Sequence, residues 1–344
     1  MRKNNFDFLR FLFAFIVVIG HIIVITGIDE IQKYRFFFNT YISVTGFFCI
    51  SGFLITRSFF NSKNLKDYFY KRAARLMPAY LLIVFTCFIL LSLISSYSTP
   101  EYFSNILTYK YLAANLTFLN FIQPTLPGVF LKEGIEYPVN GALWTLKIEV
   151  GFYLLLPIIL FFLNKTNRKL LALALIYAIS IIYNYYFKNL YSITGIQIYS
   201  TLSHQLPAFL SYFSVGIALH YYFDIIIKHK NTLFFIGLII YIIEYNLDIE
   251  VFSPIALSFI IFALAYSNLR LSNFSKNGDI SYGIYIYHFP LINLAIYFGF
   301  YTHFNPYFVS GILILILFLI SYISWHKLEV VFLRKVKSIR ISKS

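Results

Sequence analysis

The chain has 344 residues, of which 59% are hydrophobic and 12% are charged, and its formal net charge is +14. Soluble domains carry about 25% charged residues, so this composition excludes a chain whose whole surface faces water. Its apolar runs recur at about 20 residues, the length that a helix needs to cross the hydrocarbon core. We therefore expect an all-α, polytopic transmembrane helix bundle in residues 1–333, followed by a basic cytoplasmic tail in residues 334–344.

Hydropathy divides the chain into ten expected spans, and the loops between them are short except for Tyr97–Gly141. The expected spans are Phe6–Gly27, Phe36–Phe60, Leu76–Ser96, Ala142–Leu163, Lys169–Phe187, Leu206–Ile227, Leu233–Leu247, Val251–Leu269, Ile280–Phe300 and Phe308–Leu333. Arg2 and Lys3 precede the first span as in a signal peptide, but no cleavage motif follows it, so we expect a signal anchor. Loops as long as Tyr97–Gly141 are usually functional.

The distribution of Lys and Arg among the loops predicts the orientation. With the N-terminus in the cytoplasm, the cytoplasmic side collects roughly 20 of the 28 Lys and Arg residues. An even number of spans then places both termini in the cytoplasm, and eight or twelve spans would do so equally. Because most of the positive charge lies in short loops, topology explains it, and we expect no nucleic-acid partner. The expected location is the cell inner membrane.

Ionisable side chains inside the first span are candidates for function, because burying one costs several kcal/mol unless it is paired or hydrated. Arg10 and His21 are eleven residues apart, about three helical turns, so they share one face of a helix. Arg10 would lie near the inner mouth, where Asp7 can pair with it, and His21 would lie in the outer half. His21 can alternatively be a hydrogen-bonded packing residue.

The fourth span enters from outside and carries Trp144, Lys147 and Glu149. Glu149 reaches a depth close to that of His21, so the two could form an acid/base pair if their helices are neighbours. The carboxylate would then orient the imidazole and stabilise its protonated form, while the other ring nitrogen faces substrate. Alternatively, Glu149 neutralises Lys147 or Lys327.

Three further residues have two open interpretations each. Arg72 and Arg75 are three residues apart before the third span, where they either bind phosphates through their guanidinium forks or anchor the topology. His288 lies in the middle of the ninth span and is either structural or lines a site. Pro290 follows it, and a proline inside a helix kinks the helix and frees a backbone carbonyl.

Both cysteines of the chain, Cys49 and Cys87, lie inside apolar runs. This placement suits neither a disulfide framework nor a metal cluster. We expect buried structural thiols and no bound metal.

Five segments, taken in chain order, resemble motifs of the membrane acyltransferase-3 family, which includes O-antigen and capsule O-acetyltransferases. They are Arg10 and His21 with ten residues between them, Gly46–Leu54, the Arg72-x-x-Arg75 pair, Leu143–Glu149 with Thr145 in place of Ser, and Ile280–Pro290 with its Ser-Tyr-x-x-Tyr-x-x-His pattern. The similarity covers nearly the whole chain. Two sites differ from the family pattern: Phe8 and Phe11 replace the glycines beside the first Arg, and no Glu-x-Pro follows at Glu329.

The resemblance implies transfer of an acyl group, expected to be acetyl, from cytoplasmic acyl-CoA to a hydroxyl of an extracytoplasmic saccharide such as O-antigen or capsule. It implies Arg72 and Arg75 as ligands of acetyl-CoA, which serves as donor. His21, with Glu149 and Arg10, would be catalytic. The substrate would be lined by Trp144, Tyr285 and His288.

Two other classes of protein share many spans and buried charges. One is a transporter or flippase for a lipid-linked saccharide, which needs no acetyl-CoA. The other is a multispan polysaccharide polymerase, which usually has a larger outer loop than Tyr97–Gly141.

Overall fold

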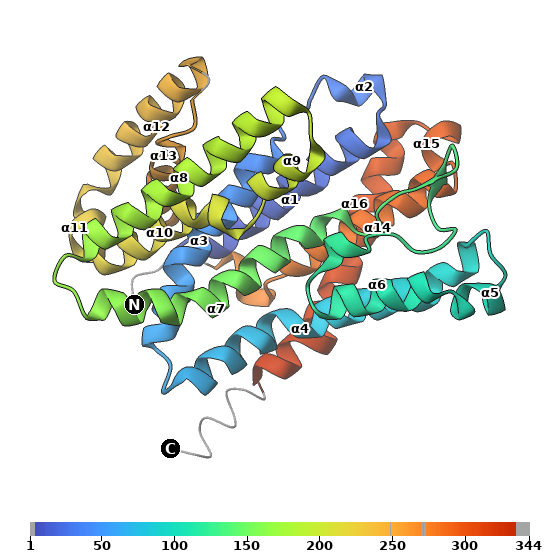
Figure 1. The fold of residues 1–344 in the computed structure, drawn as a ribbon, viewed down its shortest axis with the longest axis horizontal. Coiled ribbons are helices and arrows are strands. Elements are labelled where there is room, and N and C mark those ends of the chain that lie inside the picture. Colours follow the sequence, from blue (N-terminus) through green and yellow to red (C-terminus); the bar gives the residue numbers. More distant parts are fainter. Residues whose placement is uncertain (1–3, 248, 270, 272, 335–344) are drawn as a thin grey trace. The chain divides into compact units, whose positions relative to one another are not determined.

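The computed structural model describes residues 4–247, 249–269, 271 and 273–334, and their regular structure is helical apart from one two-stranded hairpin (Figure 1). Arg2, Lys3, Arg270 and residues 335–344 lie outside the described residues. Part of the predicted orientation and the predicted tail depend on them. The cytoplasmic placement of both termini therefore stays a prediction.

A helix overlaps each of the ten expected spans. These helices are α1 Phe6–Thr26, α3 Thr40–Phe60, α4 Leu65–Leu90, α7 Trp144–Asn164, α8 Lys169–Thr194, α10 Leu206–Tyr221, α12 Lys230–Leu247, α13 Ser253–Ala265, α14 Ser281–Tyr297 and α16 Pro306–Ser324. Among the described residues, seven helical stretches are long and apolar enough to cross a membrane. Helices α10, α13 and α14 have 16, 13 and 17 residues and are shorter than that. The all-α membrane bundle is confirmed, and the number ten stays a prediction.

The short elements connect these helices. They are α2 Asp29–Gln32, η1 Leu91–Ile94, α5 Thr99–Ser104, α6 Ile106–Leu116, η2 Asn120–Ile122, β1 Leu131–Lys132, β2 Ile135–Glu136, η3 Gly141–Leu143, α9 Gln197–Ser203, α11 Phe223–Ile226, η4 Ile227–His229, η5 Phe274–Asn277, α15 Phe300–His303 and η6 Trp325–Glu329. Strands β1 and β2 pair antiparallel, with Leu131 opposite Glu136.

Helix α4 begins at Leu65, eleven residues before the expected start of the third span at Leu76. It runs through Pro78, so Arg72 and Arg75 belong to the same helix as the span that follows them. A proline inside a helix removes one backbone hydrogen bond and strains the turn before it, yet neighbouring groups in a bundle can compensate for that loss. A proline therefore does not mark a helix start reliably here.

The long loop folds into short helices that pack on α4. Ser98 caps α5, and it forms a capping box with Glu101, whose pKa is lowered by these hydrogen bonds from the Ser98 side chain and backbone. The hydroxyl of Tyr80 donates to the carbonyl of Asn115 at 2.7 Å, and its ring stacks on Phe118 with 4.5 Å between centroids. The loop is thus an ordered part of the fold.

The described residues fall into two compact units, each assembled from separate parts of the chain. Unit 1 comprises Met1–Phe13, Tyr41–Phe69 and Ile148–Phe274. Unit 2 comprises Ala14–Thr40, Tyr70–Lys147 and Ser275–Ser344.

In unit 1, glycines let α3 and α10 approach closely. A Cβ on Gly52 would lie 2.3 Å from the carbonyl oxygen of Phe213, and one on Gly216 would lie 2.5 Å from that of Cys49. Small residues at helix crossings are typical of membrane bundles, where the lipid is as apolar as the side chains and close packing stabilises association. Gly52 belongs to the Gly46–Leu54 motif, so part of that motif serves packing.

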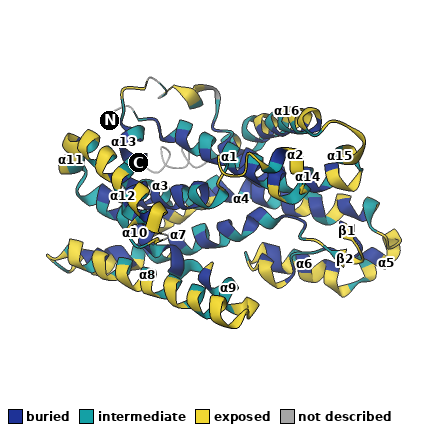
Figure 2. Cartoon of the chain, turned by 90° about the horizontal axis from the view of Figure 1, so that it is seen from above, coloured by how far each residue is buried: buried dark blue, intermediate teal, exposed yellow. Residues whose placement is uncertain are grey.

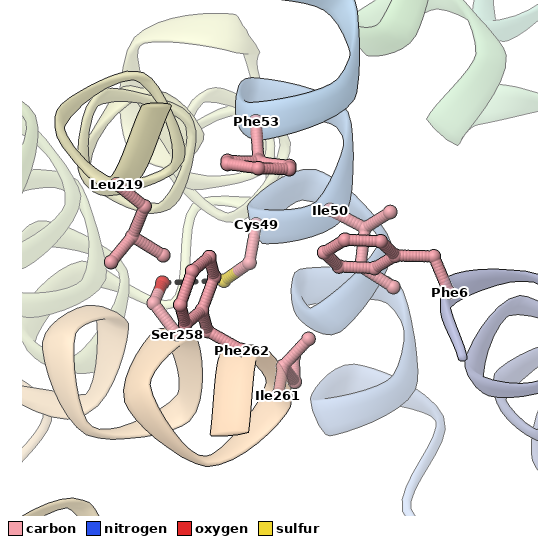
Figure 3. A pocket seen from close by; sticks show the side chains of 8 residues that line it. All are labelled: Phe6, Cys49, Ile50, Phe53, Leu219, Ser258, Ile261 and Phe262. Atoms are coloured by element: carbon pink, nitrogen blue, oxygen red, sulfur yellow. Dashed lines mark hydrogen bonds between the residues drawn. The ribbon is translucent and has the colours of Figure 1, made fainter. Parts of the chain in front are cut away.

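A small apolar pocket lies beside this crossing. Figure 3 shows Cys49 and Phe53 facing Ser258 and Leu219, with Phe6 at one side. The hydroxyl of Ser258 donates to the sulfur of Cys49 at 3.1 Å. Cys49 and Cys87 are both buried and free of disulfides, which confirms the prediction of buried thiols.

The seventh expected span is a helix despite its acidic residue. The carboxylate of Glu244 in α12 accepts from the backbone N–H of Phe252 at 2.5 Å and from the hydroxyl of Ser253 at 2.6 Å. These donors lie at the N-terminus of α13, where the first N–H groups lack helical acceptors. Glu244 therefore anchors the α12–α13 turn.

Exposed apolar side chains follow the outer face of α8, which Figure 2 shows as a run of exposed residues. Its exposed members include Leu170, Leu171, Leu175, Ile179 and Ile182. A soluble protein rarely exposes a contiguous apolar face of this kind, whereas a lipid-facing helix requires one.

Candidate functional site

His21 and His288 meet in unit 2. Nδ1 of His21 lies 2.7 Å from Nε2 of His288, and the two ring planes are 18° apart. His288 is completely buried, and its Nδ1 donates to the backbone carbonyl of Tyr285 at 2.7 Å. His21 is half-buried. The sequence predicted both histidines as candidates, but no pattern predicted their contact.

The backbone beside His288 is held by the side chain of the residue that caps η3. Pro290 has no N–H, so the carbonyl of Ile286, four residues earlier, has no helical donor. Nδ2 of Asn140 donates to this carbonyl at 2.9 Å, and Oδ1 of Asn140 accepts from the N–H of Ala142 at 3.2 Å. The sequence predicted the freed carbonyl but not its partner. An asparagine directly before a helix start was the available signal, because that residue type caps helices.

The first turn of α7 packs against the same part of α14. Thr145 Oγ1 and Tyr285 Oη are 2.6 Å apart, and both side chains are buried. A Cβ on Gly141 would lie 2.6 Å from the ring of Phe289, which in turn meets the His21 ring edge-on at 5.5 Å between centroids. A threonine here supplies the hydroxyl that the expected serine would have supplied.

Arg72 and Arg75 lie one turn apart on α4 and are half-buried. Arg75 forms an ion pair with Asp279, and its guanidinium lies 5.3 Å from the centroid of the Trp325 ring. Asp279 also accepts from the hydroxyl of Ser281 at the start of α14. Arg75 thus joins α4, α14 and η6 within unit 2, a structural function that its motif did not predict.

Glu329 is completely buried in the π-helical turn η6. The hydroxyl of Ser324 donates to its Oε1 at 3.2 Å and lies 2.7 Å from the hydroxyl of Tyr287. A π-helical turn inside a helix is often found at functional sites. Arg75 lies over the ring of Trp325 in this same turn, so Glu329 lies in the same region as the Arg75–Asp279 ion pair.

Arg10 and Glu149 belong to unit 1. Arg10 pairs with Asp7, as predicted from their spacing. The carboxylate of Glu149 accepts a hydrogen bond from Tyr153, one turn later on α7. His21 belongs to unit 2, so the pairing of Glu149 with His21 stays a prediction.

Trp144 and Lys147 complete the predicted set. Both are half-buried at the start of α7, and Nζ of Lys147 lies 4.3 Å from the centroid of the Phe121 ring. Substrate contact by Trp144, Tyr285 and His288 stays a prediction. Among the described residues, no group of three or more His, Cys, Asp or Glu side chains could hold a metal ion.

A family model described as an acyltransferase domain matches residues 3–326. The chain belongs to the acyltransferase-3 family. Membership confirms the resemblance inferred from the five motifs, and with the helices above it identifies the chain as a membrane acyltransferase.

Two curated relatives match over most of their length. The chain is 26% identical to the O-acetyl transferase of Shigella phage Sf6, over 97% of the chain and 98% of that protein. It is 26% identical to Nodulation protein 10 of Rhizobium leguminosarum bv. viciae, over 88% of the chain and 86% of that protein. No solved structure matches the chain.

Proposed function

We propose that this acyltransferase moves an acetyl group from cytoplasmic acetyl-CoA to a hydroxyl of an extracytoplasmic saccharide at the cell inner membrane. Family membership supports acyl transfer, and the name of the phage relative supports acetyl as the group and oxygen as the acceptor atom. The observation that carries the proposal is the geometry of His21. Its Nδ1 is engaged by His288, while Nε2 has no hydrogen-bond partner within the described part of unit 2.

A hydroxyl is a poor nucleophile until a base accepts its proton, and histidine suits that task near neutral pH. Nε2 of His21 accepts the proton of the acceptor hydroxyl as the hydroxyl oxygen bonds to the thioester carbonyl carbon. The carbon–sulfur bond then breaks, and His21 returns the proton to the leaving sulfur. The same base also fits a two-step route through an acyl-enzyme.

Other residues assist in this proposal. Glu149 stabilises the protonated imidazole, and Arg10 lies on the same helix as His21 toward its N-terminal end. Trp144 lies beside the acceptor.

Arg72 and Arg75 are proposed to bind the donor phosphates. A guanidinium fork matches two phosphate oxygens at once, and both residues lie on one turn of α4.

The test uses membranes that contain the protein, together with labelled acetyl-CoA and surface glycans from cells that lack the gene. We expect label on the glycan with the wild-type protein and none with His21→Ala. Mass spectrometry of glycans from cells with and without the gene then identifies the modified sugar. If glycans from the two strains carry the same acetylation but differ in amount at the surface, the protein is a flippase and the proposal is wrong.

A further inference from the structure

The direction of the hydrogen bonds between the two histidines follows from one backbone atom. The carbonyl oxygen of Tyr285 can only accept, so Nδ1 of His288 carries a proton. In a neutral imidazole the other nitrogen is then an acceptor, which makes Nε2 of His288 the acceptor for Nδ1–H of His21. His21 is therefore held as the tautomer that carries its proton on Nδ1, and its Nε2 has an available lone pair.

A charged His288 would reverse this arrangement. With protons on both nitrogens, His288 would donate to Nδ1 of His21, and a neutral His21 would carry its proton on Nε2. That form cannot accept a proton from an acceptor hydroxyl at Nε2. His288 is completely buried, and its two ring nitrogens contact a carbonyl and another imidazole rather than a carboxylate. Burying a charge without an opposite charge is costly, so the neutral form is favoured.

The structure around His288 fixes the position of its ring. Asn140 holds the carbonyl that Pro290 frees, one residue after Tyr285, and Thr145 contacts the hydroxyl of Tyr285. Phe289 packs between Gly141 and the His21 ring. The carbonyl that orients His288 is thus set by contacts from η3 and α7 as well as by its own helix.

We propose that His288 is a positioning residue, which fixes the orientation and the tautomer of His21 and does not itself touch substrate. This inference rests on the proposed function of His21 as the base. It gives a function to His288, the histidine that ends the Ser-Tyr-x-x-Tyr-x-x-His pattern. The segment that compensates for Pro290 through Asn140 also packs, through Gly141, against Phe289, whose ring meets the His21 ring edge-on.

The kinetic test compares His288→Leu with His288→Gln. Leucine removes the acceptor for Nδ1–H of His21, whereas the side-chain carbonyl of glutamine can replace it. We expect His288→Leu to lower kcat about 10- to 100-fold, less than loss of the base itself, with little change in KM for the donor. We expect His288→Gln to recover much of that loss. Tyr287→Phe is the control, since it removes a buried hydrogen bond from the adjacent residue without touching His21.

Equal kcat values for His288→Leu and the wild type would overturn the proposal, as would a glutamine variant no better than leucine. A second readout needs no acyl transfer. In protein labelled with 15N-histidine, the resonances lost in His21→Gln report the protonation of each His21 nitrogen. We expect a protonated Nδ1 and an unprotonated Nε2 at neutral pH in the wild type and Tyr287→Phe, and a changed pattern in His288→Leu.

A wild-type His21 with its proton on Nε2 would disprove the positioning function whatever the enzyme does. The predicted tautomer in a protein without acetyl transfer would instead leave the pairing intact and disprove the proposed function. The two failures are therefore distinguishable.

Discussion

At the residue scale, His21 is the position on which the proposed chemistry depends most. His21→Ala should lower acetyl transfer about 10²–10⁴-fold, the usual effect of removing a general base, while the protein still inserts and binds donor. His21→Gln should be nearly as inactive, because an amide cannot accept the proton. Glycan acetylation in cells is the measurement, and wild-type acetylation with His21→Ala would refute the mechanism.

Glu149 is tested as the partner of His21 by a double-mutant cycle. Glu149→Gln should impair turnover, because a neutral amide stabilises an imidazolium poorly. If the two residues act as a unit, the double variant should be scarcely slower than His21→Ala alone. Additive losses would separate the two residues and leave Glu149 with its Tyr153 hydrogen bond as a structural group.

Both arginines of α4 are tested by replacement with lysine, which keeps the charge but not the fork. Arg72→Lys and Arg75→Lys should each weaken donor binding. Arg75→Lys should lower stability as well, because Arg75 pairs with Asp279 and lies over Trp325. Isothermal titration calorimetry with acyl-CoA measures donor binding, and a thermal-shift assay measures stability. Unchanged donor affinity in both variants would reduce the pair to a topological anchor.

The sequence predicts a functional residue where the chemistry of its side chain conflicts with the apolar run around it. His21, Arg10 and Glu149 were recognisable because ionisable groups are costly inside apolar runs. Their partners were not, because a partner depends on which helices are neighbours. The sequence thus predicted both members of the His21–His288 pair and missed the pair itself.

At the element scale, the close crossing of α3 and α10 gives a test of packing. Gly52→Ala and Gly216→Ala place a methyl against a backbone carbonyl, which cannot move aside as a side chain could. Overpacking of this kind typically costs about 1–3 kcal/mol. Both variants should unfold at lower temperature than the wild type.

The matched control is Gly311→Ala in α16, where an added Cβ meets nothing within 4 Å. Alanine is the better helix former, so this variant should be as stable as the wild type or slightly more stable. Equal thermal stability of all three variants would contradict the crossing as described.

The helical type of the expected spans was predictable because each of them is a continuous apolar run. Their ends were less so. Helix α4 begins at Leu65, well before its apolar run. An amphipathic first part of a helix can precede the apolar part that spans the membrane, and hydropathy does not detect it. The folded structure of the Tyr97–Gly141 loop depends on contacts such as Tyr80 with Asn115, which no local pattern encodes.

At the scale of the whole molecule, the proposed function requires the donor to approach from the side on which Arg72 and Arg75 lie. The charge distribution predicts that this side is the cytoplasm. Helix α8 offers a compact test of this orientation, because its two ends should face opposite sides of the membrane. Asn167 precedes it and Ser192 lies near its end, and both are exposed.

A single reporter cysteine at each position measures the orientation directly. The native Cys49 and Cys87 are buried, so they should contribute little background with a membrane-impermeant maleimide. In cells whose outer layers admit the reagent, Ser192→Cys should be labelled while the membrane is intact, and Asn167→Cys should be labelled only after permeabilisation. The reverse pattern would place Arg72 and Arg75 outside, away from cytoplasmic acetyl-CoA. Because donor binding and acceptor access both depend on this orientation, that single result would overturn the proposed direction of transfer.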